Sequence, residues 1–289
     1  MTVCIAALAD AGKSLVLVSD SMLSTVEVSG DKIANKYFPL SDRYQWWAMI
    51  AAEDVTHVMP IIEAALPLLL RMTDETNTCD YVERTMIAAY KYVRLRYAED
   101  LVLAPIGLTL DELKNGLWNS ELIGRLNDVN LGCEFLIAGF DWSGHGYVFS
   151  IEHPGIARNH NVTGYAAIGS GAFGAISSLL FQSLNYEMEL AKVLYHVCEA
   201  KFMAESAIGV GRHTHVKVAK SGGRMDPYEL SDQLMTAIRG DWEEYGKPRV
   251  PQGTIERLRH YLVEIPKSAV KSDPQSTTAD PSRQPPSQE

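Results

Sequence analysis

The order of strand-like and helix-like segments is the feature that most constrains this fold. Two strand pairs come first, followed by two helices, a second group of strands, two further helices and a later strand. Parallel sheets arise from strands that alternate with helices, and this order does not alternate in that way. It favours an α+β protein, and we expect a four-layer αββα sandwich in which two sheets lie between two layers of helices.

The first strand pair is a hairpin that begins almost at the N-terminus. Residues 3–8 and 14–19 are rich in β-forming side chains, and turn-forming residues lie between them. A turn centred near Ala11 places Thr2 opposite Asp20. Directly opposed residues have Cβ atoms about 4.5–5.5 Å apart. We therefore expect the Asp20 carboxylate beside Thr2.

The remaining elements follow from apolar spacing and turn residues. Strands are expected at 36–40, 46–52, 134–140, 147–152, 165–168 and 208–219, and helices at 54–71, 80–99, 169–184, 186–204 and 227–238. We expect one domain over residues 2–264, with an insertion at about 101–130 that carries a short helix from Thr109. Residues 265–289 are rich in Pro, Ser, Gln and Asp, so a disordered tail is expected there.

Charge and hydropathy argue against several classes of function. The net charge is −10 and there is no long basic run, so nucleic-acid binding has no electrostatic footprint. No apolar run reaches the roughly 20 residues of a membrane-spanning helix. The N-terminal apolar stretch lacks a basic region and is interrupted by Asp10, Gly12 and Lys13. We therefore expect no signal peptide and a cytoplasmic location.

The cysteines and histidines do not predict a metal site. The four cysteines show no CxxC spacing, which is typical of free, buried thiols in a reducing compartment. His213 and His215 share one face of a predicted strand, but no third ligand is placed near them, and a surface pair is favoured over a zinc site. Cys4 is interpreted as a packing residue. Neither a metal nor a cofactor is expected.

Thr2 would carry two reactive groups once Met1 is removed. Its hydroxyl is a nucleophile, and the free α-amine has a reference pKa of about 7.7–8.0. At neutral pH a fraction of this amine can accept the hydroxyl proton, directly or through water, without a histidine. Thr after Met and Asp at a strand end are both common, so these two residues alone do not decide the function.

The segment MTVCIAAL…LVLVSD resembles the mature start of proteasome β-subunits and of the peptidase subunit of the bacterial two-component ATP-dependent protease. Those proteins begin with Thr, continue through a hairpin and place an Asp at the end of the second strand. The resemblance extends over roughly residues 2–240. It implies an N-terminal-nucleophile (Ntn) hydrolase with the proteasome-like fold, in which Thr2 is the nucleophile and Asp20 its partner.

Three further site residues follow from the resemblance. The segment KYFPLSDR is similar to the family's third strand, which starts with a lysine beside the threonine, and this role falls to Lys36, with Lys32 as the alternative. Ala52 lies where the family has a small residue that donates a backbone N–H to the oxyanion. In YAAIGSGAFGAISSLL, Ser170 matches a helper serine, although it could equally serve as a helix N-cap.

One position departs from the family pattern. The family commonly has an Asp followed three residues later by a Ser at the end of its fourth helix. If Ser206 matches this Ser, the Asp position holds Met203, and Glu205 is out of register. The second helper carboxylate is therefore not where the resemblance would place it.

These observations predict a threonine-type hydrolase that cleaves amide bonds, most simply in peptides, with Lys36 and Asp20 tuning the amine of Thr2. The resemblance implies a homo-oligomeric ring, and it allows an ATP-dependent unfoldase as a partner. Two alternatives stay open: a small-molecule amidase of the same fold, and a non-catalytic ring subunit. The second predicts a retained Met1 or an N-terminal extension, and the lack of an extension in this sequence favours catalysis.

Overall fold

A computed structural model describes residues 2–24, 29–30, 36–116, 119–247 and 251–263. The chain divides into two compact units, Met1–Gly246 and Lys247–Glu289. In the second unit, the described residues include helix α8 (Gln252–Val263). This division lies before residue 264, where we expected the domain to end. The predicted tail, 265–289, lies outside the described residues.

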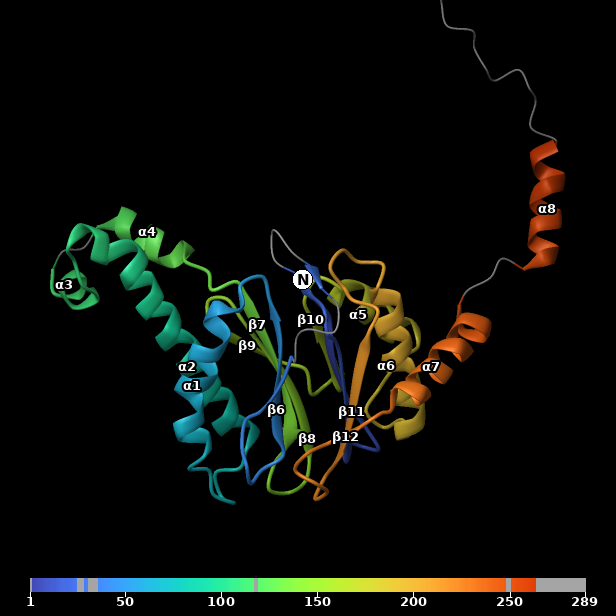
Figure 1. The fold of residues 1–289 in the computed structure, drawn as a ribbon, viewed down its shortest axis with the longest axis horizontal. Coiled ribbons are helices and arrows are strands. Elements are labelled where there is room, and N and C mark those ends of the chain that lie inside the picture. Colours follow the sequence, from blue (N-terminus) through green and yellow to red (C-terminus); the bar gives the residue numbers. More distant parts are fainter. Residues whose placement is uncertain (1, 25–28, 31–35, 117–118, 248–250, 264–289) are drawn as a thin grey trace, which may run out of the picture. The chain divides into compact units, whose positions relative to one another are not determined.

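Two five-stranded antiparallel sheets form the centre of the described part of the first unit (Figure 1). One has the order β10 (Tyr165–Ile168), β1 (Cys4–Ala9), β2 (Ser14–Asp20), β11 (Thr214–Lys220) and β12 (Tyr228–Glu229). The other has the order β5 (Tyr37–Pro39), β6 (Trp46–Ala52), β7 (Cys133–Phe140), β8 (Gly146–Glu152) and β9 (Ile156–Asn159). A short separate pair consists of β3 (Leu23–Ser24) and β4 (Ser29–Gly30). The expected α+β class with antiparallel sheets is confirmed.

The N-terminal hairpin is present, but its predicted register is wrong by one residue. Cys4 lies opposite Ser19, so Asp20 follows opposite Val3 and not opposite Thr2. The backbone N–H of Asp20 donates to Val3 O at 3.3 Å, which agrees with this register.

The hairpin loop explains the shift. Four residues, 10–13, connect the strands, and Asp10, Ala11 and Gly12 have φ angles of 51°, 54° and 80°. A loop of even length has its centre between two residues. The turn is therefore centred between Ala11 and Gly12, half a residue beyond the position that we assumed.

Helices flank the sheets. They are the 3₁₀-helix η1 (Val55–His57), α1 (Val58–Leu69), α2 (Cys79–Ala98), the π-helix η2 (Glu99–Leu103), the 3₁₀-helix η3 (Ala104–Ile106), α3 (Leu110–Lys114), α4 (Ser120–Asp128), α5 (Ala172–Phe181), α6 (Leu190–Ala204), α7 (Asp232–Asp241) and the π-helix η4 (Trp242–Gly246). The two largest differences from the predicted boundaries are at the starts of β11 and α7. β11 begins at Thr214 and not at residue 208, and α7 begins at Asp232 because the Ser231 side chain caps it by accepting from Leu234 N.

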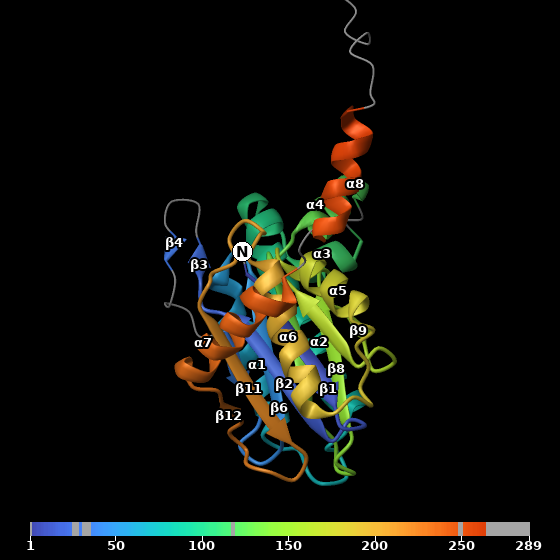
Figure 2. The same ribbon diagram turned by 90° about the vertical axis from the view of Figure 1, so that its right-hand side faces the viewer.

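Strand alternation divides the core of the first unit. Every residue of β1 is buried, because each of its two faces packs against another layer. Val3 and Ile5 belong to an apolar cluster with Val197 of α6, and Figure 2 shows α6 across β1 and β2. Cys4 and the other even-numbered residues of β1 pack against Trp47 and Leu136 of the second sheet.

The outer face of the second sheet is covered by α1 and α2 (Figure 1). Ile61 and Ile62 of α1 and Tyr90 of α2 share an apolar cluster with Trp46 and Phe135. One apolar cluster thus lies between the two sheets, and each sheet shares a further cluster with helices.

In the described part of the predicted insertion, α4 is a further α-helix besides α3, the short helix that we expected. Thr109 caps α3 through a capping box with Glu112. The segment has its own small apolar cluster, which includes Leu103 and Leu126. Arg94 of α2 donates to the carbonyl oxygens of Leu126, Asn127 and Val129 at 2.9 Å each. The insertion is thus anchored on α2.

Candidate active site

Thr2, Asp20 and Lys36 come together from three elements. Thr2 precedes β1, Asp20 ends the neighbouring strand β2, and Lys36 precedes β5 of the opposite sheet. All three are buried, with exposed fractions of 2%, 0% and 9%. Buried polar groups need partners, because an unpaired one costs its desolvation. The three side chains supply partners to one another.

The Thr2 hydroxyl lies between the Asp20 carboxylate and the Lys36 ammonium group. Thr2 Oγ1 donates to Asp20 Oδ1 and accepts from Lys36 Nζ. Lys36 Nζ also donates to Asp20 Oδ1 at 2.8 Å. An ammonium group that donates to a hydroxyl stabilises negative charge that develops on the hydroxyl oxygen.

Backbone amides fix the Asp20 carboxylate. Asp20 Oδ1 also accepts from Val3 N at 3.0 Å, and Oδ2 accepts from Met22 N at 3.2 Å and Gly211 N at 3.0 Å. Because Val3 lies directly opposite Asp20, the carboxylate reaches the adjacent Thr2 in spite of the shifted register. We did not identify Gly211 from sequence, since residues 208–219 read as an unbroken strand and in the structure a loop precedes β11.

Ser170 contacts the backbone of Thr2. Thr2 N donates to Ser170 Oγ at 3.2 Å, and Ser170 Oγ lies 3.3 Å from Thr2 O and 3.1 Å from Ile208 O. A serine hydroxyl has one proton, so it can donate to only one of these two carbonyls at a time. The N-cap interpretation of Ser170 is wrong, because Gly171 is the N-cap of α5 and makes no side-chain cap bond.

Gly169 makes the close approach to Thr2 geometrically feasible. Its φ is +89°, and a Cβ placed there would lie 2.4 Å from Thr2 O. An L side chain is disfavoured both by this φ and by the contact. Glycine at 169 therefore brings the segment before Ser170 against the N-terminal strand.

The Ala52 amide points toward the side of β6 that faces β5. Glu53 N donates to Gly132 O, toward β7, at 2.8 Å. Successive amides of a strand point to opposite sides. The N–H of Ala52 is thus directed away from β7, toward the side from which Lys36 comes. Ala52 also lines the same cavity as Thr2.

The residues at the family's second helper position do not reach Thr2. Ser206 Oγ donates to Met203 O at 2.9 Å, and the Met203 side chain is 43% exposed. Glu205 has other partners: its carboxylate accepts from Lys201 Nζ at 2.5 Å and from Arg239 Nη1 and Nη2 at 2.8 and 2.6 Å. The alternative lysine, Lys32, lies outside the described residues.

Lys201 is a second buried lysine near the site. Its side chain is fully buried, and Nζ donates to Glu205 Oε1, to Gly211 O at 2.7 Å and to Arg212 O at 3.1 Å. Burial lowers the pKa of Lys201, and the adjacent Glu205 carboxylate opposes this change. Because Gly211 N also donates to Asp20, Lys201 stabilises the loop that supports the acid of the site.

The cysteines are unreactive in their surroundings. Burial raises the pKa of the Cys4 thiol to about 12, and Cys4 Sγ donates to Ile50 O at 3.4 Å. Burial likewise raises the pKa values of Cys79, Cys133 and Cys198 to about 12 each. A thiol is nucleophilic as the thiolate, so none of these side chains competes with Thr2 as a nucleophile.

A cavity of about 310 Å³ opens beside Thr2. Ala51 and Ala52 line it from β6, Glu134 from β7, and Ser170 from the segment before α5. Its size lies at the lower end of ligand pockets, which hold roughly 300–1,000 Å³. The cavity can therefore admit a side chain next to the nucleophile.

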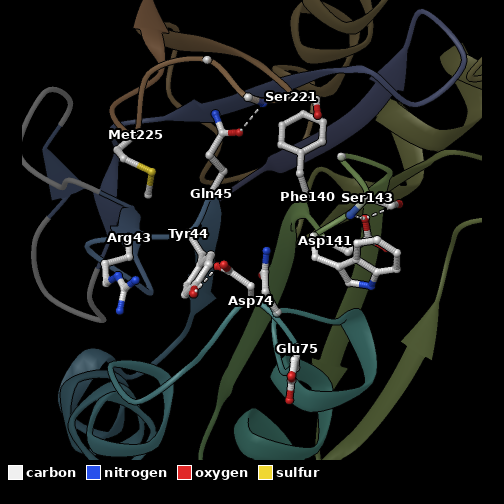
Figure 3. A pocket seen from close by; sticks show the side chains of 15 residues that line it. Arg43, Tyr44, Gln45, Asp74, Glu75, Phe140, Asp141, Ser143, Ser221 and Met225 are labelled. Carbon is white, nitrogen blue, oxygen red and sulfur yellow. Dashed lines mark hydrogen bonds between the residues drawn. The ribbon is translucent and has the colours of Figure 1, made fainter.

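A larger cavity, of about 1020 Å³, lies at the end of β6 opposite to Ala52, and Figure 3 shows the side chains that line it. Gln45, which lines it, precedes the first residue of β6, whereas Ala52 is the last, and seven residues at about 3.3 Å each separate the two ends by roughly 20 Å. Two of its polar side chains are already paired: Tyr44 Oη donates to Asp74 at 2.8 Å, and Gln45 Oε1 accepts from Gly222 N at 3.0 Å. Cavity volume alone therefore does not identify the candidate active site.

The described residues show neither a metal cluster nor a membrane span. No group of three His, Cys, Asp or Glu side chains in this part of the chain is arranged to hold a metal ion. The rings of His213 and His215 lie 4.7 Å apart, and His215 Nδ1 is 2.9 Å from Glu229. Among the described helices, none is both long and apolar enough to cross a bilayer.

Comparison with known proteins supports the fold. No protein-family model and no curated protein matches this chain. Among solved structures it is similar to Anbu (ancestral β-subunit) from Yersinia bercovieri, with a TM-score of 0.60 and 16% identity over 93% of this chain and 100% of that one. It is also similar to a Gly-1 mutant of Anbu from Hyphomicrobium sp. strain MC1, with a TM-score of 0.57 and 13% identity over 92% and 99%. The chain has an Anbu-like fold.

Proposed function

We propose that this protein is a threonine-type Ntn hydrolase that cleaves amide bonds, most simply in peptides, with Thr2 as nucleophile. One observation carries the proposal: the buried hydroxyl of Thr2 contacts both Asp20 and Lys36. A threonine with a structural role alone has no need of an ammonium group and a carboxylate on the same oxygen. The Anbu-like fold agrees with a proteasome-like hydrolase.

The proposed mechanism starts with removal of Met1, which converts the amide nitrogen of Thr2 into an amine. This amine, close to Ser170 Oγ, accepts the hydroxyl proton. Thr2 Oγ1 attacks the substrate carbonyl, and the Lys36 ammonium, held by Asp20, stabilises the charge on the attacking oxygen. The Ala52 N–H donates to the oxyanion. The protonated amine then donates to the leaving amine, and water hydrolyses the acyl-enzyme.

The architecture and assembly belong to the same proposal. We assign the first unit to the four-layer αββα sandwich, which is supported by one apolar cluster between the sheets and one between each sheet and its helices. The proposed assembly is a homo-oligomeric ring in the cytoplasm, with an ATP-dependent unfoldase as a candidate partner. The name of the similar solved structure, Anbu (ancestral β-subunit), agrees with a subunit of an assembly.

A second candidate is a non-catalytic ring subunit. It is favoured by Met203, which stands where the family commonly has an acid, and by Ser206, whose hydroxyl bonds to the Met203 carbonyl. A small-molecule amidase would use the same residues as the leading proposal. Parallel panels of peptides and small amides distinguish it from a peptidase.

Intact-mass measurement before and after treatment with a threonine-directed epoxyketone tests the proposal. We expect the purified protein to lack Met1 and to gain one inhibitor mass on Thr2. Thr2→Ala should abolish hydrolysis and adduct formation and leave assembly unchanged. A retained Met1, or a Thr2 that forms no adduct, would favour the non-catalytic subunit.

A further inference from the structure

The cavity beside Thr2 is negatively charged. Three glutamates line it: Glu53, Glu134 and Glu152. Within the described residues, no lysine or arginine lines it. A concave site lined by charges of one sign focuses their field and concentrates ligands of the opposite sign. The charge of this cavity therefore bears on which substrates can lie against Thr2.

The Glu134 carboxylate is fixed in the cavity wall by a hydrogen bond. It lies on β7 opposite Ala51, and its Oε2 accepts from Gly169 N at 3.2 Å. This bond joins the second sheet to the segment that precedes Ser170. A carboxylate has several lone pairs, so Glu134 can still accept from a ligand.

The other two glutamates differ in their pairing. Glu152 forms an ion pair with Arg158, which offsets its charge. Glu53 follows β6, is exposed, and has no side-chain partner in the part of the chain that the structure describes. Two carboxylates, those of Glu53 and Glu134, therefore contribute uncompensated negative charge.

His153 does not supply the missing positive charge. It lines the cavity, and burial together with nearby Arg94 lowers its pKa below the usual 6.5, so the imidazole is neutral at pH 7. Its Nδ1 is buried and makes no hydrogen bond among the described residues. His153 therefore adds no positive charge that would offset the carboxylates.

We infer that the cavity selects substrates with a cationic side chain, lysine-like or arginine-like, next to the bond that Thr2 attacks. This inference rests on the proposed function. A guanidinium or ammonium group has only donors, and the cavity offers the acceptors of Glu53 and Glu134. A glutamate side chain would bring a third uncompensated negative charge into the same space.

The test uses three fluorogenic peptides that differ only in the residue before the scissile bond: arginine, citrulline or glutamate. Citrulline has the shape of arginine without its charge. We expect kcat/KM for arginine to exceed that for citrulline by about tenfold or more, and glutamate to be the poorest substrate. Equal values for arginine and citrulline would overturn the inference.

Variants assign the preference to the carboxylates. Glu134→Gln keeps an acceptor for Gly169 N and removes the charge, so the arginine-to-citrulline ratio should fall toward one. Glu53→Gln should lower the ratio less, because exposed charges are screened by solvent. Glu63→Gln makes the same charge change on the exposed face of α1 and should leave the ratio as it is. A Glu134→Gln ratio equal to that of the unmodified protein would contradict the inference.

A binding measurement separates this inference from the proposed function. Calorimetry on Thr2→Ala compares acetyl-argininamide with acetyl-citrullinamide, and neither requires turnover. Preferred binding of argininamide together with no hydrolysis by the unmodified protein would support the cavity assignment and overturn the hydrolase. Equal binding, with hydrolysis that depends on Thr2, would support the hydrolase and overturn the cavity assignment.

Discussion

Two buried lysines lie near the N-terminal strand, and they differ in what they contact. Lys36 donates to a carboxylate and to the Thr2 hydroxyl, which is a group that can react. Lys201 donates to a carboxylate and to two backbone carbonyls. An ammonium group has three protons, so these three acceptors satisfy Lys201 completely.

The difference shows that burial and pairing do not by themselves identify a catalytic lysine. Lys201 is the more deeply buried of the two, and its pKa is lowered by burial, as in many functional lysines. Its acceptors, however, are fixed groups of the fold. Lys36 instead contacts the Thr2 hydroxyl, the proposed nucleophile, beside a cavity, and this distinguishes the two lysines.

Of the two lysines, Lys36 should have the larger effect on activity when it is removed. Lys36→Met deletes the ammonium group on Thr2 Oγ1, and we expect hydrolysis to fall by about 10²–10⁴-fold, the range for a positioned acid–base group. Asp20 keeps its three backbone donors, so the fold should persist. Initial rates and circular dichroism measure the two effects. Lys192→Met, on an exposed lysine, is the control.

Removing Lys201 should act on stability first. Lys201→Met removes the donor of the buried Gly211 carbonyl, whereas Glu205 and Arg212 O keep Arg239 as a donor, so we expect a loss of about 1–3 kcal/mol. Chemical denaturation measures this loss, and the rate per folded molecule should fall less than in Lys36→Met. The comparison breaks down if Lys201→Met abolishes the reaction at unchanged stability.

Substitution of Gly169 should disturb Thr2 without changing any charge. The Cβ of Gly169→Ala would lie against Thr2 O in a backbone conformation that favours glycine, at a cost of about 1–3 kcal/mol. We expect slower hydrolysis and weaker epoxyketone labelling. Gly222→Ala is a matched control, because its φ is +69° and a Cβ there meets no atom within 4 Å. If both variants behave alike, the contact with Thr2 is unimportant.

A histidine outside both lysine clusters, His160, gives the smallest expected effect. Burial and nearby Arg158 lower the pKa of His160, so the folded state binds a proton less readily than the unfolded state. Stability should therefore fall as pH drops through 6.5, where the unfolded histidine becomes charged. Between pH 7.5 and 5.5, the urea midpoint of unfolding should therefore change less in His160→Gln than in the unmodified protein. An equal change in the two proteins would assign the pH dependence to other groups.

Local sequence patterns predicted the strands better than the contacts between them. The hairpin followed from β-forming runs around a turn, but its register depended on three residues with positive φ, two of which are not glycine. Alanine at position 11 gives no sequence signal for a left-handed conformation, so the turn was placed slightly too early.

The candidate site shows the same division. Thr2 and Asp20 were predicted to lie together because they flank the open end of one hairpin. Lys36 was proposed from the family resemblance. The support from Gly211 was not predictable, since a backbone amide has no residue-type signature. The bond between Glu205, at the end of α6, and Arg239 of α7 joins two segments that are separated in sequence by β11 and β12.

The four cysteines, three of them buried and Cys79 half-buried, have a practical consequence for chemical labelling. With thiol pKa values of about 12, only about one side chain in 10⁵ is a thiolate at pH 7. Maleimides, iodoacetamide and air oxidation should therefore leave the native protein nearly unmodified. An electrophilic reporter that becomes attached to the folded chain under these conditions has therefore reacted with an oxygen or nitrogen nucleophile, and peptide mapping can test the proposed label on Thr2 without prior replacement of any cysteine.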